Sequence, residues 1–259
     1  MTAPPPADAI DRVAPTRRPP GRTAMWQRWA DLLFLHWAVP PDRLRALLPP
    51  GLELDTLEGK AYVGLVPFTM TGVRPVWAPP WAPLSNFHET NVRTYVHREG
   101  RDPGVWFFSL DASNSIAVRI ARALWRLPYH YARMSLIRES DGTAQGNGYP
   151  CVRYCTERLW PGPLPASCRV RYGPCGPAAP AAVGTLEHFL VERYILYAYA
   201  RGRLYSGRVH HRPYPLQPAA CDSLEENLIA AAGINRPDEA PLAHYASEVC
   251  VRIFPLRRV

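Results

Sequence analysis

Short runs in which hydrophobic and polar residues alternate, separated by prolines and glycines, make up most of the chain. Successive side chains of a β-strand point to opposite faces, so this alternation predicts strands. We expect strands over residues 61–66, 91–97, 105–111, 132–138, 149–156, 167–172, 194–199, 204–210 and 248–254. In the second of these, one face carries Asn91, Arg93, Tyr95 and His97.

Two helices are predicted in the first half of the chain. A short one begins at Pro40 and Pro41, because proline is tolerated in the first turn of a helix, and Pro49 stops it. A longer one spans 115–127, and Pro128 ends it. Its apolar stripe, which we expect to face the core, consists of Ile116, Ile120, Ala123, Leu124 and Leu127.

Two further helices are predicted in the second half. Residues 185–191 form a short capped helix. Asp222, followed three residues later by Glu225, resembles a capping box and opens a helix that ends near Gly233. Many strands with a few isolated helices favour an α+β, mainly β fold with a barrel or strongly curved sheet at its centre.

The chain has 259 residues, which suits one domain with a substantial core. Residues 1–23 are rich in proline and have no apolar stretch, so we expect a disordered N-terminal tail and a single domain over 24–259. No apolar run reaches the ~18 residues that a membrane-spanning helix needs. The N-terminus does not resemble a secretory signal, and a cytoplasmic location is expected.

Positive charge is high but scattered. The net charge is +8, from 29 arginines and one lysine against 22 acidic residues, with no basic run longer than two. A nucleic-acid surface would gather these charges on one face, so neither nucleic acid nor membrane is expected as a partner. Homo-oligomerisation is left open by the sequence.

Six cysteines occur at positions 151, 155, 168, 175, 221 and 250. None of their spacings matches the Cys-x-x-Cys pattern of zinc ribbons or redox motifs. We therefore expect reduced structural thiols, no metal and no cofactor. The single lysine, Lys60, follows the predicted hairpin turn Glu58-Gly59, where a side chain faces solvent.

Several segments together resemble the YqjF-like proteins, a bacterial family in the acetoacetate decarboxylase-like superfamily. They are HWAVPPDRLRALLPPGLELD (36–55), AYVGLVPFTM (61–70), NVRTYV (91–96), GVWFFSLDAS (104–113), LPYHYARM (127–134), FLVERYILY (189–197) and VHHRPYPL (209–216). The resemblance implies a cone-shaped β-barrel with a few flanking helices around an internal cavity.

The same resemblance bears on the mechanism. In acetoacetate decarboxylase, two acidic residues on or after strands precede a helix and a Gly-x-Pro-Lys-Lys segment, whose first lysine forms a Schiff base. Here the order is Glu89, Asp111, a helix and then Leu127-Pro128-Tyr129-His130. Tyr129 and His130 stand where the resemblance places the lysines, and neither can form an iminium with a ketone. Schiff-base chemistry is therefore not expected.

The candidate site consists of polar residues within apolar strand sequence: Glu89, Arg93, Asp111, Tyr129, His130, Glu192 and Arg193. In one account they are structural ion pairs, in which Glu89 or Asp111 pairs with Arg93, and Glu192 with a neighbouring arginine. In the other, Arg93 binds a ligand carboxylate, Glu89 or His130 is a general base, and Tyr129 donates to an oxyanion.

The remaining candidates, Asp111, Glu192 and Arg193, would then contribute to ligand binding. His210 and His211 are adjacent on a strand and point to opposite faces, and we expect His210 to be the one that contacts the cavity. Two functions follow from the two accounts of the site. One is an internal pocket for a small organic or keto acid, with or without catalysis. The alternative is a non-catalytic structural or interaction protein in which Trp106, Phe108 and Trp125 fill the cavity.

Overall fold

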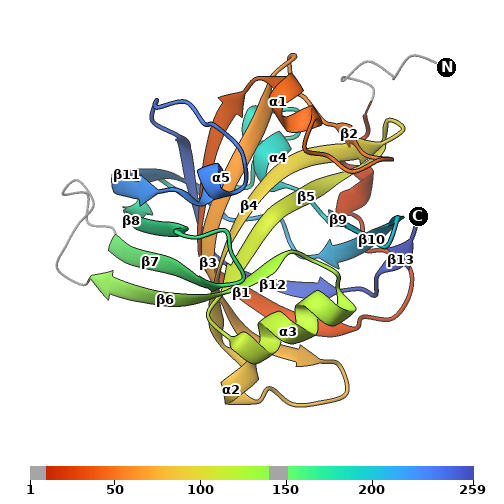
Figure 1. Ribbon diagram of the computed structural model, residues 1–259, viewed down its shortest axis with the longest axis horizontal. Coiled ribbons are helices and arrows are strands. Elements are labelled where there is room, and N and C mark those ends of the chain that lie inside the picture. Colours follow the sequence, from red (N-terminus) through yellow and green to blue (C-terminus); the bar gives the residue numbers. More distant parts are fainter. Residues whose placement is uncertain (1–9, 140–150) are drawn as a thin grey trace.

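The computed structural model describes residues 10–139 and 151–259 and is made mainly of strands (Figure 1). The strands are β1 (Met25–Val39), β2 (Glu53–Leu54), β3 (Ala61–Pro75), β4 (Phe87–Arg98), β5 (Arg101–Ala112), β6 (Tyr129–Glu139), β7 (Cys151–Trp160), β8 (Ser167–Pro174), β9 (Ile195–Ala200), β10 (Arg203–His210), β11 (Leu216–Glu226), β12 (Leu242–Ile253) and β13 (Arg257–Arg258). The helices are η2 (Ala14–Thr16), α1 (Pro41–Arg45), α2 (Ala82–Ser85), α3 (Ser115–Leu124), α4 (Leu186–Val191) and α5 (Leu228–Ala231). The predicted α+β, mainly β class is confirmed.

Five neighbouring strands, in the order β12-β1-β3-β4-β5, form the centre of the sheet. At one end, β5 pairs with β6 through residues 110–112 and with β9 through residues 105–106. At the other end, β12 pairs with both β11 and β10. One branch runs through β6, β7, β8 and β11, and the other through β9 and β10. Each branch joins β5 to β12, so the strand pairings return on themselves.

The two faces of the central strands pack against different layers. On β1, Leu33 and Leu35 belong to a core with Tyr154 and Tyr172 of the β7 and β8 branch. The alternate residue Phe34 belongs to a second core with Phe189 of α4 and residues of β10 and β12. Both faces are therefore buried, and polar residues on either face need partners inside the protein.

Strand β1 was not predicted, although it pairs with both β3 and β12. A strand buried on both faces has a continuous apolar run instead of an alternating one, as in Leu32-Leu33-Phe34-Leu35. Asp31, which precedes that run, has a left-handed φ of 51° and interrupts the regular strand. For both reasons, hydrophobic and polar residues do not alternate along β1.

The helix predicted from Asp222 is wrong. Residues 216–226 form β11, which pairs with β8, and only Leu228–Ala231 is helical. The register shifts between Cys221 and Ser223, and Asp222 forms an ion pair with Arg171 of β8. Pairing with a neighbouring strand overrides the local capping signal, which acts only within one turn of helix.

Helix α3 is present, but the expectation for its apolar stripe is wrong. Ile116, Ile120 and Leu124 are 52%, 45% and 68% exposed, while Val118 is buried. The helix lies across the lower front of the molecule (Figure 1). The stripe therefore faces solvent along α3, and only its last member, Leu127, which follows the helix, is buried as expected.

The expectation of a disordered tail over residues 1–23 is wrong for residues 10–23. Ile10 is buried, and Arg12 forms an ion pair with Asp55 at 2.5 Å. Residues 10–23 thus pack on the body of the protein, and residues 1–9 lie outside the described part.

Candidate functional site

Glu89 and Tyr129 form one side-chain contact on the α4-facing side of the central strands. Tyr129, at the start of β6, donates its hydroxyl to Glu89 Oε2 of β4 at 2.8 Å. Glu89 is 2% exposed. Burial raises the pKa of Glu89 to about 8, although hydrogen bonds from Tyr129 and Asn91 act in the opposite direction. Glu89 is consequently protonated for the most part at neutral pH, which makes it a buried acid of tuned pKa.

Arg93 lies on the same face of β4 as Glu89, four residues further along. Its side chain is buried, with Nη2 donating to the carbonyl of Leu190 at 3.1 Å. The guanidinium lies over the rings of Phe34 and Tyr95, at 5.6 and 5.8 Å from the ring centroids. No described carboxylate forms an ion pair with it, and its Nε has no hydrogen-bond partner among the described residues. The expected pairing of Arg93 with Glu89 or Asp111 is wrong.

A glycine brings His36 and Arg93 close together. Gly64 pairs with His36 on β1 and with Arg93 on β4, so the three form one row across the sheet. Tyr95 bonds His36 Nε2 at 2.6 Å and the Leu190 carbonyl at 2.7 Å. Burial, followed by the charge of Arg93, holds the pKa of His36 well below its usual value. His36 was not among the predicted site residues; the interrupted pattern of β1 concealed it.

Asp111 and His130 lie on the opposite face from Glu89 and Tyr129. Asp111 is bonded at both oxygens by Arg158 of β7, at 2.7 and 2.8 Å, and both side chains are almost fully buried. His130 is adjacent to Asp111 in register and contacts the carbonyl of Pro161 through Nδ1 at 2.8 Å. Burial lowers the pKa of His130. The structure thus separates the predicted residues into two groups, and Asp111 serves a structural ion pair.

Arg193 and Glu192 also have partners within the protein. Arg193 forms a buried ion pair with Asp55 at 2.7 Å and donates through Nε to the carbonyl of Phe189. Glu192 accepts the hydroxyl of Tyr194 and the backbone N–H of Tyr214. The expected pairing of Glu192 with an arginine is therefore wrong.

His211, not His210, is the inward-facing member of the histidine pair. His211 is buried and stacks on Tyr194, with 4.4 Å between ring centroids, whereas His210 is half-buried at the end of β10. Burial lowers the pKa of His211 to about 4, so the ring is neutral. The expectation that His210 contacts the interior is wrong because the strand pleat places it on the outer side.

Lys60 is exposed at the turn that precedes β3, as expected, and its backbone bonds to Leu57. All six cysteines are free thiols. Within residues 10–139 and 151–259, no group of three or more His, Cys, Asp or Glu side chains has the arrangement to hold a metal ion. The same ranges contain no helix that is long and apolar enough to cross a membrane.

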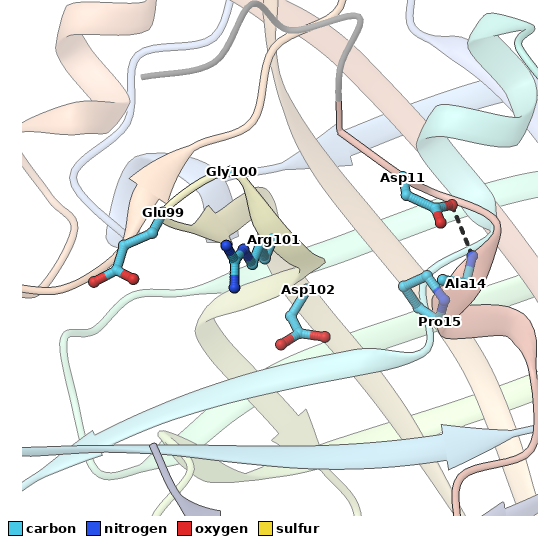
Figure 2. A pocket seen from close by; sticks show the side chains of 7 residues that line it. All are labelled: Asp11, Ala14, Pro15, Glu99, Gly100, Arg101 and Asp102. Atoms are coloured by element: carbon cyan, nitrogen blue, oxygen red, sulfur yellow. Dashed lines mark hydrogen bonds between the residues drawn. The ribbon is translucent and has the colours of Figure 1, made fainter. Parts of the chain in front are cut away.

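A surface pocket of about 500 Å³ lies between residues 11–15 and the hairpin residues 99–102 (Figure 2). One of its acidic side chains, Asp11, already accepts hydrogen bonds from the backbone N–H groups of Val13 and Ala14. These hydrogen bonds lower the pKa of Asp11. A second hollow of about 740 Å³ lies beside β5 and α3. Neither Glu89 nor Arg93 lines these two hollows.

Comparisons with known proteins agree on family and fold. A model of the DUF2071 family, described as an uncharacterized conserved protein, matches residues 26–250. The uncharacterized protein YqjF of Bacillus subtilis (strain 168) is 38% identical over 240 residues, which are 93% of this chain and 94% of that protein.

Solved structures give the fold. Acetoacetate decarboxylase from Legionella pneumophila superposes with a TM-score of 0.59 and 14% identity, covering 95% of this chain and 94% of its own. The enduracididine biosynthesis enzyme MppR, complexed with pyruvate, gives a TM-score of 0.58 and 14% identity, covering 92% of this chain and 91% of its own. At these identities the likeness shows a shared architecture and not a shared activity.

Proposed function

Because the chain belongs to the DUF2071 family and has an acetoacetate decarboxylase-like fold, we propose that it binds a small organic acid, such as a keto acid, at the face of β4 that carries Glu89 and Arg93. The closed strand pairings support a cone-shaped barrel around this face. The observation that carries the proposal is the burial of Arg93 without a carboxylate partner among the described residues.

A buried guanidinium is costly unless an anion or several acceptors compensate it. The other two buried arginines near the site, Arg158 and Arg193, each have an aspartate. Arg93 has one backbone carbonyl and two aromatic rings instead. The planar fork of an arginine fits a carboxylate at two points, so a ligand carboxylate is the group that best completes this environment. The pyruvate complex of the structurally similar MppR supports the same ligand class.

Glu89 and Tyr129 supply acid–base chemistry for such a ligand. With a pKa raised to about 8, Glu89 carries a proton at neutral pH and can donate it to a carbonyl oxygen or enolate. Tyr129 orients Glu89 through the 2.8 Å hydrogen bond. The sole lysine, Lys60, is exposed on a turn, so the proposed chemistry proceeds without a Schiff base, unlike that of acetoacetate decarboxylase.

A thermal-shift titration tests the proposal. Pyruvate and acetoacetate are the probes, and acetone is the neutral control. A ligand at 100 times its Kd stabilises the native state by about 2.7 kcal/mol, which gives a clear rise in melting temperature. Arg93→Met should abolish the rise while keeping the fold, because it removes an uncompensated buried charge and keeps an unbranched apolar side chain. Arg133→Met, at an exposed surface ion pair, should leave the rise unchanged.

Two outcomes would contradict the proposal. The first is no shift with any of the acids, which favours the alternative of a non-catalytic structural protein. The second is an equal shift in the wild type and in Arg93→Met. Borohydride treatment in the presence of acetoacetate checks the mechanism separately, since covalent capture at a lysine would restore the Schiff-base route.

A further inference from the structure

On one side of β5 the sheet divides into two branches. Between them, a stretch of β5 pairs with a described strand only on its other side, with β4. Strand β9 pairs with residues 105–106 and strand β6 with residues 110–112, both on the side of β5 opposite β4. For residues 107–109 no pairing is seen on that side within the described chain. Figure 1 shows β6 and β9 leaving β5 toward opposite sides, with α3 below them. We call the hollow at this division the fork groove.

The fork groove has a volume of about 740 Å³, in the range of small-molecule sites. Aromatic side chains, including Trp106 and Phe108, form part of its wall, so two of the three residues expected to fill an internal cavity border this hollow. Phe108 sits at a register shift between β4 and β5, and such irregularities often occur at binding sites. The wall thus offers flat apolar surface to a ligand.

The charge of the fork groove has one sign. Arg122, Arg126 and Arg201 line it, and none of the described residues in its lining is acidic. None of the three arginines forms an ion pair with a described carboxylate. Arg122 donates to the carbonyl of Tyr129, and Arg126 lies over the ring of Tyr205 at 4.2 Å. An anionic group entering the groove would therefore meet arginines that have no competing acid.

Two of these arginines occupy backbone conformations that favour glycine. Arg126 follows α3 with φ of 57°, and Arg201 forms the β9–β10 turn with φ of 52°. Helix ends and tight turns in the left-handed region usually carry glycine or asparagine, because a Cβ there is strained. Strained residues of this kind gather at functional sites. Here two arginines, each in an unfavourable conformation, lie at the same groove.

We infer that the fork groove is a binding site for an amphipathic anion, in which a carboxylate or phosphate contacts Arg126 and Arg201 and a flat apolar body lies against Trp106 and Phe108. This site is separate from the one on β4 and does not depend on the function proposed there. Its ligand class differs too, because the groove is open to solvent and takes a body larger than a keto acid.

Isothermal titration calorimetry with three naphthalene probes tests the inference. We expect 2-naphthoate or 2-naphthyl phosphate to bind and the neutral 2-naphthol to bind at least about tenfold more weakly, because only the anions form charge-assisted hydrogen bonds. The comparison of the two anions distinguishes a carboxylate site from a phosphate site. Raising the salt concentration should weaken the binding of either anion.

Glycine variants separate binding from folding. Arg201→Gly and Arg126→Gly suit the left-handed backbone, so they should fold with an unchanged or higher melting temperature, yet bind the anion about tenfold more weakly or worse. Arg203→Ala is the matched control, since Arg203 is exposed on the same hairpin and does not line the groove. Equal binding of naphthoate and naphthol, or wild-type affinity in both glycine variants, would overturn the inference. Arg93→Met should leave naphthoate binding intact, which keeps this test independent of the first site.

Discussion

Gly64 lies between His36 and Arg93 in one row of residues across the sheet. A methyl group at Gly64 would lie 3.1 Å from the His36 ring and 3.4 Å from Arg93 Cγ. The distance to His36 is shorter than ordinary van der Waals contact, whereas the distance to Arg93 is at the short end of it, so the His36 ring must give by a few tenths of an ångström. Since His36 and Arg93 are buried, neither can turn toward solvent. The absence of a side chain at position 64 therefore helps to set the position of the guanidinium.

The first prediction is that Gly64→Ala weakens ligand binding more than it weakens the fold. Overpacking a buried site typically costs about 1–3 kcal/mol, which urea denaturation measures. In the same variant, the rise in melting temperature with pyruvate should be smaller than in the wild type, the same direction of change that is expected for Arg93→Met. A variant that keeps wild-type stability and a full pyruvate shift would show that Gly64 does not set the position of Arg93.

The second prediction concerns the pH dependence of stability. The pKa of Glu89 is raised from 4.5 to about 8 in the folded state. The unfolded chain therefore releases this proton at lower pH than the folded chain, and the contribution of Glu89 to stability is fully present below pH 4.5 and is lost as pH rises to about 8. The upper bound on the slope is about 1.4 kcal/mol per pH unit.

Glu89→Gln should remove this slope, because an amide does not titrate. Urea unfolding between pH 5 and 8 should show the variant gaining stability relative to wild type as pH rises. Glu225→Gln is the control: its side chain is 79% exposed, and the substitution should leave the slope unchanged. A Glu89→Gln curve parallel to that of the wild type would mean that Glu89 is ionised in the folded protein at neutral pH.

The sequence grouped Glu89 and Tyr129 as candidate residues but did not predict the partners of the other candidates. Glu89 and Tyr129 were identified from the order of motifs, and they are in contact. The partner of Asp111, in contrast, is Arg158, which lies 47 residues away on β7. That pairing depends on how β7 is placed beside β6, which no local pattern specifies.

The same limit applies to the fold. Strand β4 was predicted because its residues alternate, and it is found, extended by a few residues at its N-terminal end. Strand β1 was missed because burial on both faces removes the alternation. The last residues of β11, from Asp222 on, were mistaken for the start of a helix because their local signal is a good helix cap. In each case the environment that decides the outcome comes from strands distant in sequence.

The third prediction is that Asp111→Asn is strongly destabilising. Arg158 would keep its charge in a buried position without a counter-ion, and loss of one partner of a buried pair typically costs about 3–5 kcal/mol. Glu157→Gln breaks an exposed pair with Arg133 and should cost less than about 1 kcal/mol. Urea denaturation of both variants compares the two. Similar small losses in both would indicate that water reaches Arg158.

The fourth prediction concerns His211. Its pKa is lowered from 6.5 to about 4 because the ring is buried, and Nε2 has no partner among the described residues. The unfolded chain therefore takes up a proton between about pH 6.5 and 4 that the folded chain does not, so this part of the stability is present above pH 6.5 and is lost as pH falls toward 4.

His211→Phe should keep the ring stacked on Tyr194 while removing the titrating group. We expect the variant to resist acid better than the wild type, with the difference growing by up to about 1.4 kcal/mol per pH unit as pH falls below 6.5. Unfolding midpoints in urea at pH 4.5, 5.5 and 6.5 measure this difference. Because Glu89 contributes the opposite slope above pH 4.5, the double variant with Glu89→Gln should have a flatter profile than either single variant. If the two single-variant effects do not add, His211 and Glu89 are coupled through the α4-facing core that both border.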